Sequence, residues 1–405
     1  MGSRPIKVCI CGLVARALCS IFLLPEAQGI NSSAQRTAKI VVVPLPLSSH
    51  VAIHDAIIVE MLDRGHQVKL IYPENGTPRL RSQLLSHSNL TVEHYADFEP
   101  DLMLADFVLA GGSALADKLG IPKAIMVPFF GSGMMNNLFG SGASLLATVP
   151  QFTSRLPRHM NLLQRLQNLA VYVMNDIGFT FVLEAHLNKV IWRHYDIAPY
   201  SMSKSSQQAA LILAGSDWAV SSSQPLSPHI VMFGAITAKS PRPLPPHLES
   251  FVGAAEEHGA VFASLGSTAI PEVPEIKAIA KALSAIAPTR AVWKLAKKDL
   301  ELVGVNSSDL NLGDNILLSD WVPQNDLLGH PNIKAFFTQG GTNSFNEAAY
   351  HGVPIVGMPI FAEQPDTVAQ AAYALPKTLT SRDCSRCAGA CSLDKGGSVF
   401  APLAS

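Results

Sequence analysis

The sequence predicts an α/β protein of two domains, each built around a doubly wound parallel sheet. Apolar, β-branched segments alternate with amphipathic segments up to about residue 150, and the alternation returns after about residue 255. A proline-rich stretch without periodicity, 240–251, separates the two series. With 405 residues, 48% of them hydrophobic, the chain can bury two cores. We therefore expect a first domain at 38–240, a linker at 241–254 and a second domain at 255–375.

The first domain begins with a short β-branched strand at 39–46. A helix follows, in which Ile53, Ile57 and Met61 share one face, and Gly65 is suited to end it because glycine readily adopts the left-handed C-cap conformation. Between about 150 and 205 the pattern is mainly helical. Further strands are predicted at 67–73, 101–106, 123–128, 209–215 and 217–223.

The second domain repeats this alternation. A strand at 260–267 ends in a glycine turn, and an amphipathic helix at 274–286 begins with a proline. Further strands are predicted at 291–296, 315–321, 333–339 and 353–359. Ligands of such sheets bind beyond the carboxyl ends of the strands, which is therefore where a site is expected.

Composition and cysteine positions narrow the class of protein. Charged residues make up 15% of the chain, the formal net charge is -1, and no basic stripe with interleaved aromatics occurs, which argues against a nucleic-acid partner. The six cysteines lie only near the two ends, so no disulfide is expected in the body of the fold. No uninterrupted apolar run of about 18 residues occurs in the body, so no membrane span is expected there.

Residues 1–29 resemble a secretory signal, with Arg4 and Lys7 ahead of an apolar stretch and small residues near a cleavage site. This predicts entry into the secretory pathway, with the protein in the endoplasmic reticulum lumen or secreted. Because Arg16 interrupts the apolar run, the alternative is an uncleaved segment that associates with a membrane surface.

The stretch 336–354, "FFTQGGTNSFNEAAYHGVP", reads as a strand, a paired-glycine turn and a helix start. Gly340 and Gly341 would let backbone amides approach an anion, and the helix start adds a positive dipole end. The alternative needs no ligand, because Ser344 and Glu347 have the spacing of a capping box. No dinucleotide or P-loop glycine fingerprint occurs, which disfavours an NAD-linked enzyme.

Two residues of the first domain could move protons. His50 follows the first strand and opens a helix, where an imidazole could act as a general base. Asp106 ends a strand, and its carboxylate could orient that histidine. The alternatives are an ordinary helix-face histidine, which is favoured for His54, and a turn or helix-cap aspartate. Asp101 precedes the same strand and belongs to the opposite edge of the sheet.

The joint spacing of these residues favours a ligand site. The segment 321–366, "WVPQNDLLGHPNIKAFFTQGGTNSFNEAAYHGVPIVGMPIFAEQPD", closely resembles the nucleotide-sugar signature of the family 1 UDP-glycosyltransferases. The resemblance extends through "VFASLGS" to "PLSSH" and "LAD", and covers about 39–370. It implies a GT-B fold, in which two Rossmann-like domains face each other across a cleft and the first binds the acceptor.

The resemblance also implies roles for individual residues. Trp321 would stack on uracil, Gln324 would bond the ribose or base, and Glu347 would bind the ribose hydroxyls. His50 would take the acceptor's proton, with Asp106 behind it. The remaining donor contacts would be Ser267, Gln339, Gly341, Asn343 and Ser344 around the diphosphate, and Glu363 and Gln364 at the sugar. The implied reaction is an inverting, metal-independent transfer of a hexosyl or glucuronosyl unit from a UDP-sugar to a hydroxyl of a small lipophilic acceptor, with no cofactor.

Two features depart from the family pattern. Gln339 stands where most relatives carry a histidine, and its amide can donate a hydrogen bond but never carry a positive charge. After Gln370 the helical pattern of the family is missing, which predicts an incomplete second domain and an atypical, disordered tail at 376–405. The alternative function is therefore a catalytically inactive nucleotide-sugar-binding or regulatory protein. The sequence does not indicate an oligomeric state.

Overall fold

The computed structural model describes most of both predicted domains and little of the two ends. The described residues are 37–45, 47–71, 87–92, 98–129, 133–141, 145–157, 159–178, 182, 184–187, 189–190, 201–218, 221–267, 270–374 and 398–399. The predicted secretory signal lies outside these residues, and so does the predicted tail apart from Ser398–Val399. Those two predictions therefore stay predictions.

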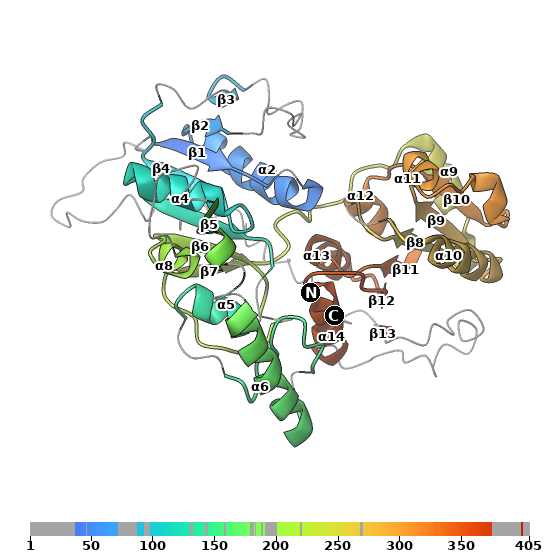
Figure 1. The fold of residues 1–405 in the computed structure, drawn as a ribbon. Helices are drawn as coiled ribbons and strands as arrows, with labels where there is room; N and C mark the ends of the chain where they lie inside the picture. Colours follow the sequence, from blue (N-terminus) through green and yellow to red (C-terminus); the bar gives the residue numbers. More distant parts are fainter. Residues whose placement is uncertain are drawn as a thin grey trace, which may run out of the picture. The chain divides into compact units, whose positions relative to one another are not determined.

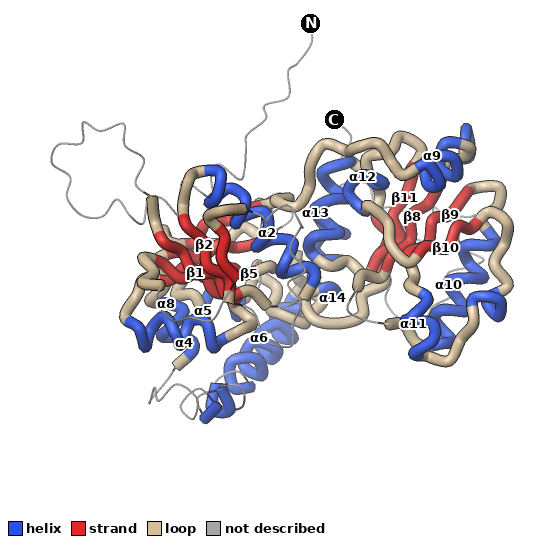
Figure 2. Tube along the Cα trace, turned by 90° about the horizontal axis from the view of Figure 1, so that it is seen from above, coloured by secondary structure: helices blue, strands red, loops and turns tan. Residues whose placement is uncertain are grey.

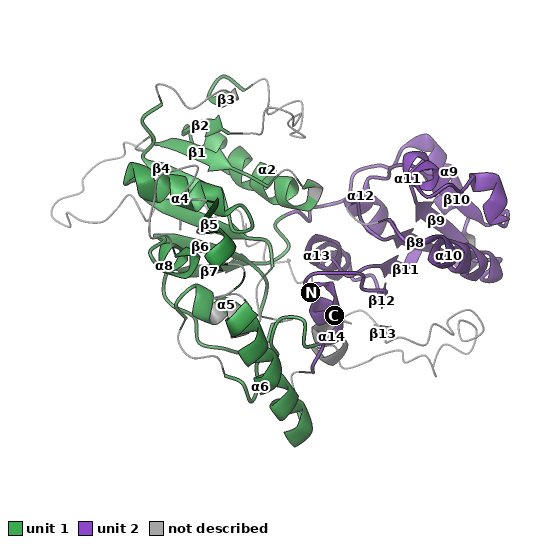
Figure 3. Ribbon diagram, viewed as in Figure 1, with its two compact units in different colours: residues 1–154, 159–236 green, residues 155–158, 237–405 purple. Residues whose placement is uncertain are grey.

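The chain folds as two compact units (Figure 3). Unit 1 comprises 1–154 and 159–236, and unit 2 comprises 155–158 and 237–405. This division differs from the predicted linker at 241–254, because Pro246–Gly253 forms helix α9, with a proline in its first turn. The segment before α9 is held to unit 2 by bonds from the Lys239 and Arg242 amides to the side chains of Asn325 and Asp326.

Unit 1 contains a seven-stranded sheet within the described residues, and all its strand pairs are parallel (Figure 1). The strand order is β3-β2-β1-β4-β5-β6-β7. The strands are β1 Lys39–Val43, β2 Gln67–Leu70, β3 Leu90–Val92, β4 Leu102–Asp106, β5 Lys123–Val127, β6 Leu211–Gly215 and β7 Ile230–Phe233. The order reverses between β1 and β4, so the chain leaves these two neighbouring strands toward opposite sides of the sheet.

Helices cover both faces of this sheet (Figure 2). The described helices of unit 1 are α2 Ser48–Asp63, α4 Ala110–Leu119, α5 Gly133–Leu138, α6 Leu162–Ile177 and α8 Met202–Gln207. Alternate residues of β1 enter different cores: Val42 packs with α2, whereas Val41 and Val43 pack on the other face with Ala116 of α4. Burial on both faces explains why these strands are continuously apolar rather than alternating.

Unit 2 has a six-stranded sheet within the described residues, in the order β10-β9-β8-β11-β12-β13. Its strands are β8 Ala260–Ser264, β9 Arg290–Lys294, β10 Ile316–Ser319, β11 Ile333–Thr338, β12 Ile355–Gly357 and the antiparallel β13 Ser398–Val399. Its longer helices are α9, α10 Val273–Ala285, α13 Thr342–His351 and α14 Gln364–Ala374, and the shorter ones are α11 Lys297–Leu302 and α12 Gln324–Leu328. Phe262 of β8 stacks on Phe336 of β11, with ring centroids 4.6 Å apart, in the middle of the sheet.

One predicted strand of unit 1 is wrong. The described residues of 217–223 are not a strand, and the sheet is instead extended by β7 at Ile230–Phe233, which was not predicted. Serines account for the difference, because the buried hydroxyls of Ser216 and Ser221 bond each other after β6. Short polar side chains stabilise such turns at the expense of a strand ladder.

Candidate functional site

The fold brings His50 and Asp106 together. His50 lies in the first turn of α2, just after β1, and Asp106 is the last residue of β4. The two strands are neighbours, with Val43 paired to Ala105, so the residues that follow them emerge side by side at the carboxyl edge. This edge is the switch point at which open α/β sheets bind ligands.

The two side chains form a buried, closely bonded pair. His50 Nδ1 lies 2.6 Å from Asp106 Oδ2, and the Val108 amide donates to Asp106 Oδ1 at 3.0 Å. Asp106 is fully buried and His50 is 7% exposed. A carboxylate can only accept, so Nδ1 carries the hydrogen and neutral His50 keeps its lone pair on Nε2. Such a histidine is oriented to accept a proton at Nε2.

His54 lies one helical turn beyond His50 and is fully buried. Its Nδ1 bonds the His50 carbonyl oxygen at 3.0 Å and lies 4.0 Å from Asp106 Oδ2. Burial lowers the pKa of His54, while the Asp106 charge opposes that shift. The imidazole of His54 therefore stays neutral next to the His50–Asp106 pair. The prediction for His54 was an ordinary helix-face histidine, and the structure shows that it lies on a buried face of α2.

In unit 2, Gln324, Ser344 and Glu347 form one hydrogen-bonded group. Gln324 opens α12, and its Nε2 donates to Ser344 Oγ at 3.1 Å and to Glu347 Oε2 at 2.8 Å. The capping-box interpretation is wrong: α13 begins at Thr342, its N-cap is Gly341, and no side chain caps it. Because the helix starts before Ser344, the serine and the glutamate lie one turn apart on the helix side that meets α12.

Glu347 is a partly buried carboxylate on α13. Burial raises the pKa of Glu347, and the hydrogen bond from Gln324 opposes this shift. A carboxylate held this way keeps acceptor capacity beyond its bond to Gln324, and a vicinal diol is a matching pair of donors. Gln324 and Glu347 were both predicted donor-binding residues, and in the structure they are in contact.

Gln339 packs against the glycine turns of unit 2. It follows β11, is 9% exposed, and accepts a bond from Thr338 Oγ1 at its Oε1 (2.9 Å). Its Nε2 is turned toward Gly266 and Gly341: a Cβ added to these glycines would lie 2.3 Å and 3.1 Å from that nitrogen. Gly266 also has a positive φ of 85°, so a side chain is excluded there by both backbone and space. β8 and β11 are neighbours, which is why their loops meet.

The other predicted donor residues have varied surroundings. Trp321 follows β10 and is 67% exposed, so it is not a core residue. Ser267 is exposed, Asn343 lies in the first turn of α13, and Thr342 Oγ1 donates weakly to Glu363 Oε1 at 3.4 Å. Gln364 is only 4% exposed, and its Oε1 accepts the Ile360 and Phe361 amides. Only its amide nitrogen is left for a ligand.

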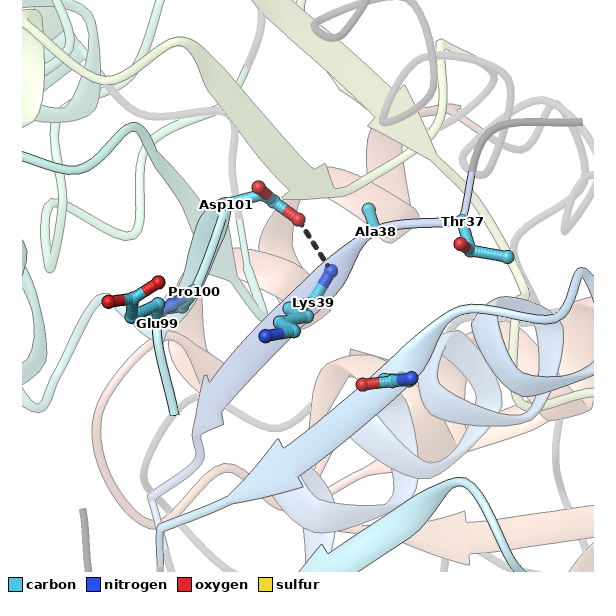
Figure 4. Close-up of a pocket in the computed structure, with 7 residues that line it drawn as sticks. Thr37, Ala38, Lys39, Glu99, Pro100 and Asp101 are labelled. Atoms are coloured by element: carbon cyan, nitrogen blue, oxygen red, sulfur yellow. Dashed lines mark hydrogen bonds between the residues drawn. The ribbon is translucent and has the colours of Figure 1, made fainter. Parts of the chain in front are cut away.

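A pocket of about 330 Å³ lies at the other end of the unit 1 sheet (Figure 4). It is lined by Thr37, Ala38, Lys39, Gln67, Glu99, Pro100 and Asp101, and Asp101 Oδ2 accepts the Lys39 amide at 2.7 Å. These residues precede or begin β1, β2 and β4, so the pocket lies at the amino edge, as predicted for Asp101, and away from the His50–Asp106 pair.

Two further features concern the described part of the chain only. Within it, no group of three or more His, Cys, Asp and Glu side chains could hold a metal ion. Among the same residues, no helix is both long enough and apolar enough to cross a membrane.

Comparison with known proteins places the chain in a family. It is 34% identical over 271 residues to the 2-hydroxyacylsphingosine 1-beta-galactosyltransferase of Mus musculus, which covers 67% of this chain and 48% of that protein. It is 36% identical over 274 residues to the UDP-glucuronosyltransferase 2A2 of Mus musculus, covering 66% and 49%. The chain thus spans about half the length of the curated relatives it matches.

The fold has solved counterparts. A UDP-glucosyltransferase from Polygonum tinctorium matches with a TM-score of 0.58 at 16% identity, covering 85% of this chain and 84% of that one. The two parallel-sheet α/β units are those of the GT-B fold. Residues 79–378 match the family described as "UDP-glucoronosyl and UDP-glucosyl transferase", and this chain therefore belongs to that family.

Proposed function

We propose that this protein is a UDP-sugar-dependent glycosyltransferase that transfers a hexosyl or glucuronosyl group to a hydroxyl of a small lipophilic acceptor. The observation that carries the proposal is the buried His50–Asp106 pair at the carboxyl edge of unit 1, with its 2.6 Å bond. Membership of the UDP-glucoronosyl and UDP-glucosyl transferase family supports it independently.

In the proposed reaction, His50 Nε2 accepts the proton of the acceptor hydroxyl. The oxygen forms a bond to the anomeric carbon of the sugar, and the bond from that carbon to the diphosphate oxygen breaks, so UDP leaves with the electron pair. Asp106 holds Nδ1 of His50 and stabilises the imidazolium that forms. A single displacement of this kind inverts the anomeric centre.

The donor would be held by unit 2. Trp321 offers an exposed indole for stacking on uracil, and the Gln324–Glu347 group offers acceptors for the ribose hydroxyls. The α13 start at Gly341, with Asn343 and Ser344 in its first turn, supplies amide and hydroxyl donors for the diphosphate. Ser267, Glu363 and Gln364 complete the proposed donor contacts.

The names of the relatives suggest classes of donor and acceptor, but they do not single out one substrate. The similar proteins are named for galactosyl and glucuronosyl transfer, and one is named for an acylsphingosine acceptor. We therefore propose a UDP-hexose or UDP-glucuronate donor and an apolar acceptor with a reactive hydroxyl. Entry into the secretory pathway remains part of the proposal.

The test is an assay of UDP release by the purified chain, with several UDP-sugars and a panel of phenol, sterol and sphingolipid acceptors. Turnover that His50→Ala abolishes while UDP still binds supports the proposal. A fully active His50→Ala variant refutes the assigned base. A chain that binds UDP but turns over no acceptor on the panel points instead to a nucleotide-sugar-binding protein.

A further inference from the structure

Lys294 is a positive charge at the carboxyl edge of the unit 2 sheet to which no role has yet been assigned. It is the last residue of β9 and pairs in register with Ser264, the last residue of β8. Its side chain is partly buried, and burial lowers the pKa of Lys294 while the Asp299 charge opposes that shift. The residue therefore lies beside the loop that carries Gly266 and Ser267.

The ammonium of Lys294 has no close counter-charge in the described part of the chain. No carboxylate there lies within the 4.0 Å of a salt bridge, and its hydrogen bond goes to the Gly266 carbonyl oxygen at 3.4 Å. The buried Lys123 of unit 1 differs, because it bonds both the Asp117 carboxylate and Ser205 Oγ. Partly burying a cation without a close counter-charge is unfavourable, so the position suits the binding of an anion.

The neighbours of Lys294 face the proposed diphosphate site. The same Gly266 whose carbonyl accepts from Lys294 packs against the amide of Gln339. Gln339 is neutral at every pH, and toward an anion it can offer only the neutral N–H donors of its amide. A diphosphate carries at least two negative charges, and a leaving diphosphate gains more, so a site with only neutral donors would leave that charge poorly balanced.

We propose that Lys294 binds the diphosphate of the donor and supplies the positive charge that Gln339 cannot. This inference rests on the proposed function, because it needs UDP to bind in unit 2. The ammonium is a compact charge on a flexible stem, so it can contact phosphate oxygens while it stays close to the Gly266 loop.

Calorimetric titration of UDP, UMP and uridine onto the whole chain tests the proposal. Lys294→Met is expected to weaken UDP binding about 10-fold or more, the scale of one charge-assisted hydrogen bond, and to leave uridine within about 2-fold. The matched control is Lys298→Met, which removes an equal charge from an exposed position on α11 four residues away. It should change neither ligand.

Equal loss of UDP and uridine binding, or no loss of UDP binding, overturns the inference. If the wild-type chain itself binds no UDP, the proposed function fails with it; if wild type binds UDP and Lys294→Met binds it equally well, only the role of Lys294 fails. Lys294→Arg, which keeps the charge, should retain most of the UDP affinity.

Two further measurements separate the parts of the proposal. In a Gln339→His background at pH 6, Lys294→Met should cost less UDP affinity than in wild type, because a protonated histidine restores a charge; strict additivity argues against compensation. Should Lys294→Met fail to fold, acetylation of the wild-type chain followed by mass spectrometry replaces it. UDP should protect Lys294 and uridine should not, and equal labelling with both refutes the contact.

Discussion

Replacing Asp106 by asparagine tests the catalytic pair most directly. In the folded protein both carboxylate oxygens accept hydrogen bonds, one from His50 Nδ1 at 2.6 Å and one from the Val108 amide at 3.0 Å. Asparagine has one acceptor and one donor at these two positions. If the asparagine oxygen faces His50, its NH2 group faces the Val108 amide, and two donors meet. If the NH2 group faces His50, the histidine must move its proton from Nδ1 to Nε2.

The second outcome removes the base, because Nε2 then carries a hydrogen and cannot accept the acceptor's proton. General-base catalysis is worth about 10²- to 10⁴-fold in rate, so we expect Asp106→Asn to lower kcat by that range. The free energy of unfolding should fall by about 1–3 kcal/mol, the cost of one buried donor without an acceptor. UDP affinity should be unchanged, because the proposed donor contacts all lie in unit 2.

The assay is the rate of UDP release at saturating donor and acceptor, with UDP affinity by calorimetry and stability by denaturant titration. Asp101→Asn is the matched control: it alters an aspartate that accepts the Lys39 amide at the amino edge of the same sheet, away from His50. It should keep its turnover rate. An Asp106→Asn variant with kcat within about threefold of wild type would refute the role of Asp106, since even the lower limit of the expected loss is far larger.

Four other predictions follow from the same geometry. Glu347→Ala should weaken UDP binding about 10-fold in calorimetry while Tm changes little, because it removes an acceptor from the Gln324–Glu347 group; unchanged affinity contradicts the ribose role. Gln339→His should lower the donor KM or raise kcat, and if both stay unchanged the neutral donor does not limit diphosphate binding. Gly266→Ala should destabilise unit 2 more than Gly304→Ala in denaturant titration: both glycines have a positive φ, but only a Cβ on Gly266 meets Gln339, so equal losses reject the close contact. Burial lowers the pKa of His54 and of His66, with Arg64 adding to the shift for His66, and each folded pKa lies below the ordinary value of 6.5. Folded histidines of this kind bind protons less readily than unfolded ones, so their contribution to stability is present above about pH 6.5 and is lost as the pH falls below it; His54→Gln should show a smaller loss between pH 7 and pH 5.

The sequence alone was enough for most of the local elements and for the family. Continuous apolar runs between helical periods indicated parallel strands buried on both faces, and β1 of unit 1 and β8 of unit 2 are such strands. Resemblance along 321–366 named the residues that follow the strands of unit 2, and the family match confirmed that membership. Local patterns of this kind are readable because each depends on neighbours a few residues away.

Local patterns gave the wrong answer where tertiary packing decided the conformation. The capping-box spacing of Ser344 and Glu347 was real in the sequence, but α13 begins two residues earlier, and both side chains face Gln324 on another helix. The strand predicted at 217–223 failed because buried serines bond within a loop. Spacing along the chain carries no information about a partner from a separate element.

Strand order was decided only by the tertiary structure, and both parts of the candidate site depend on it. His50 and Asp106 are 56 residues apart, and they meet because β4 lies beside β1. Lys294, which sequence reasoning missed, meets Gly266 because β9 lies beside β8. That no carboxylate of the described residues lies close to it is visible only once its neighbours are placed. The sequence by itself determined which residues end the strands. Their meeting required the sheets to assemble, because contacts between strands are set by burial of both sheet faces rather than by order along the chain.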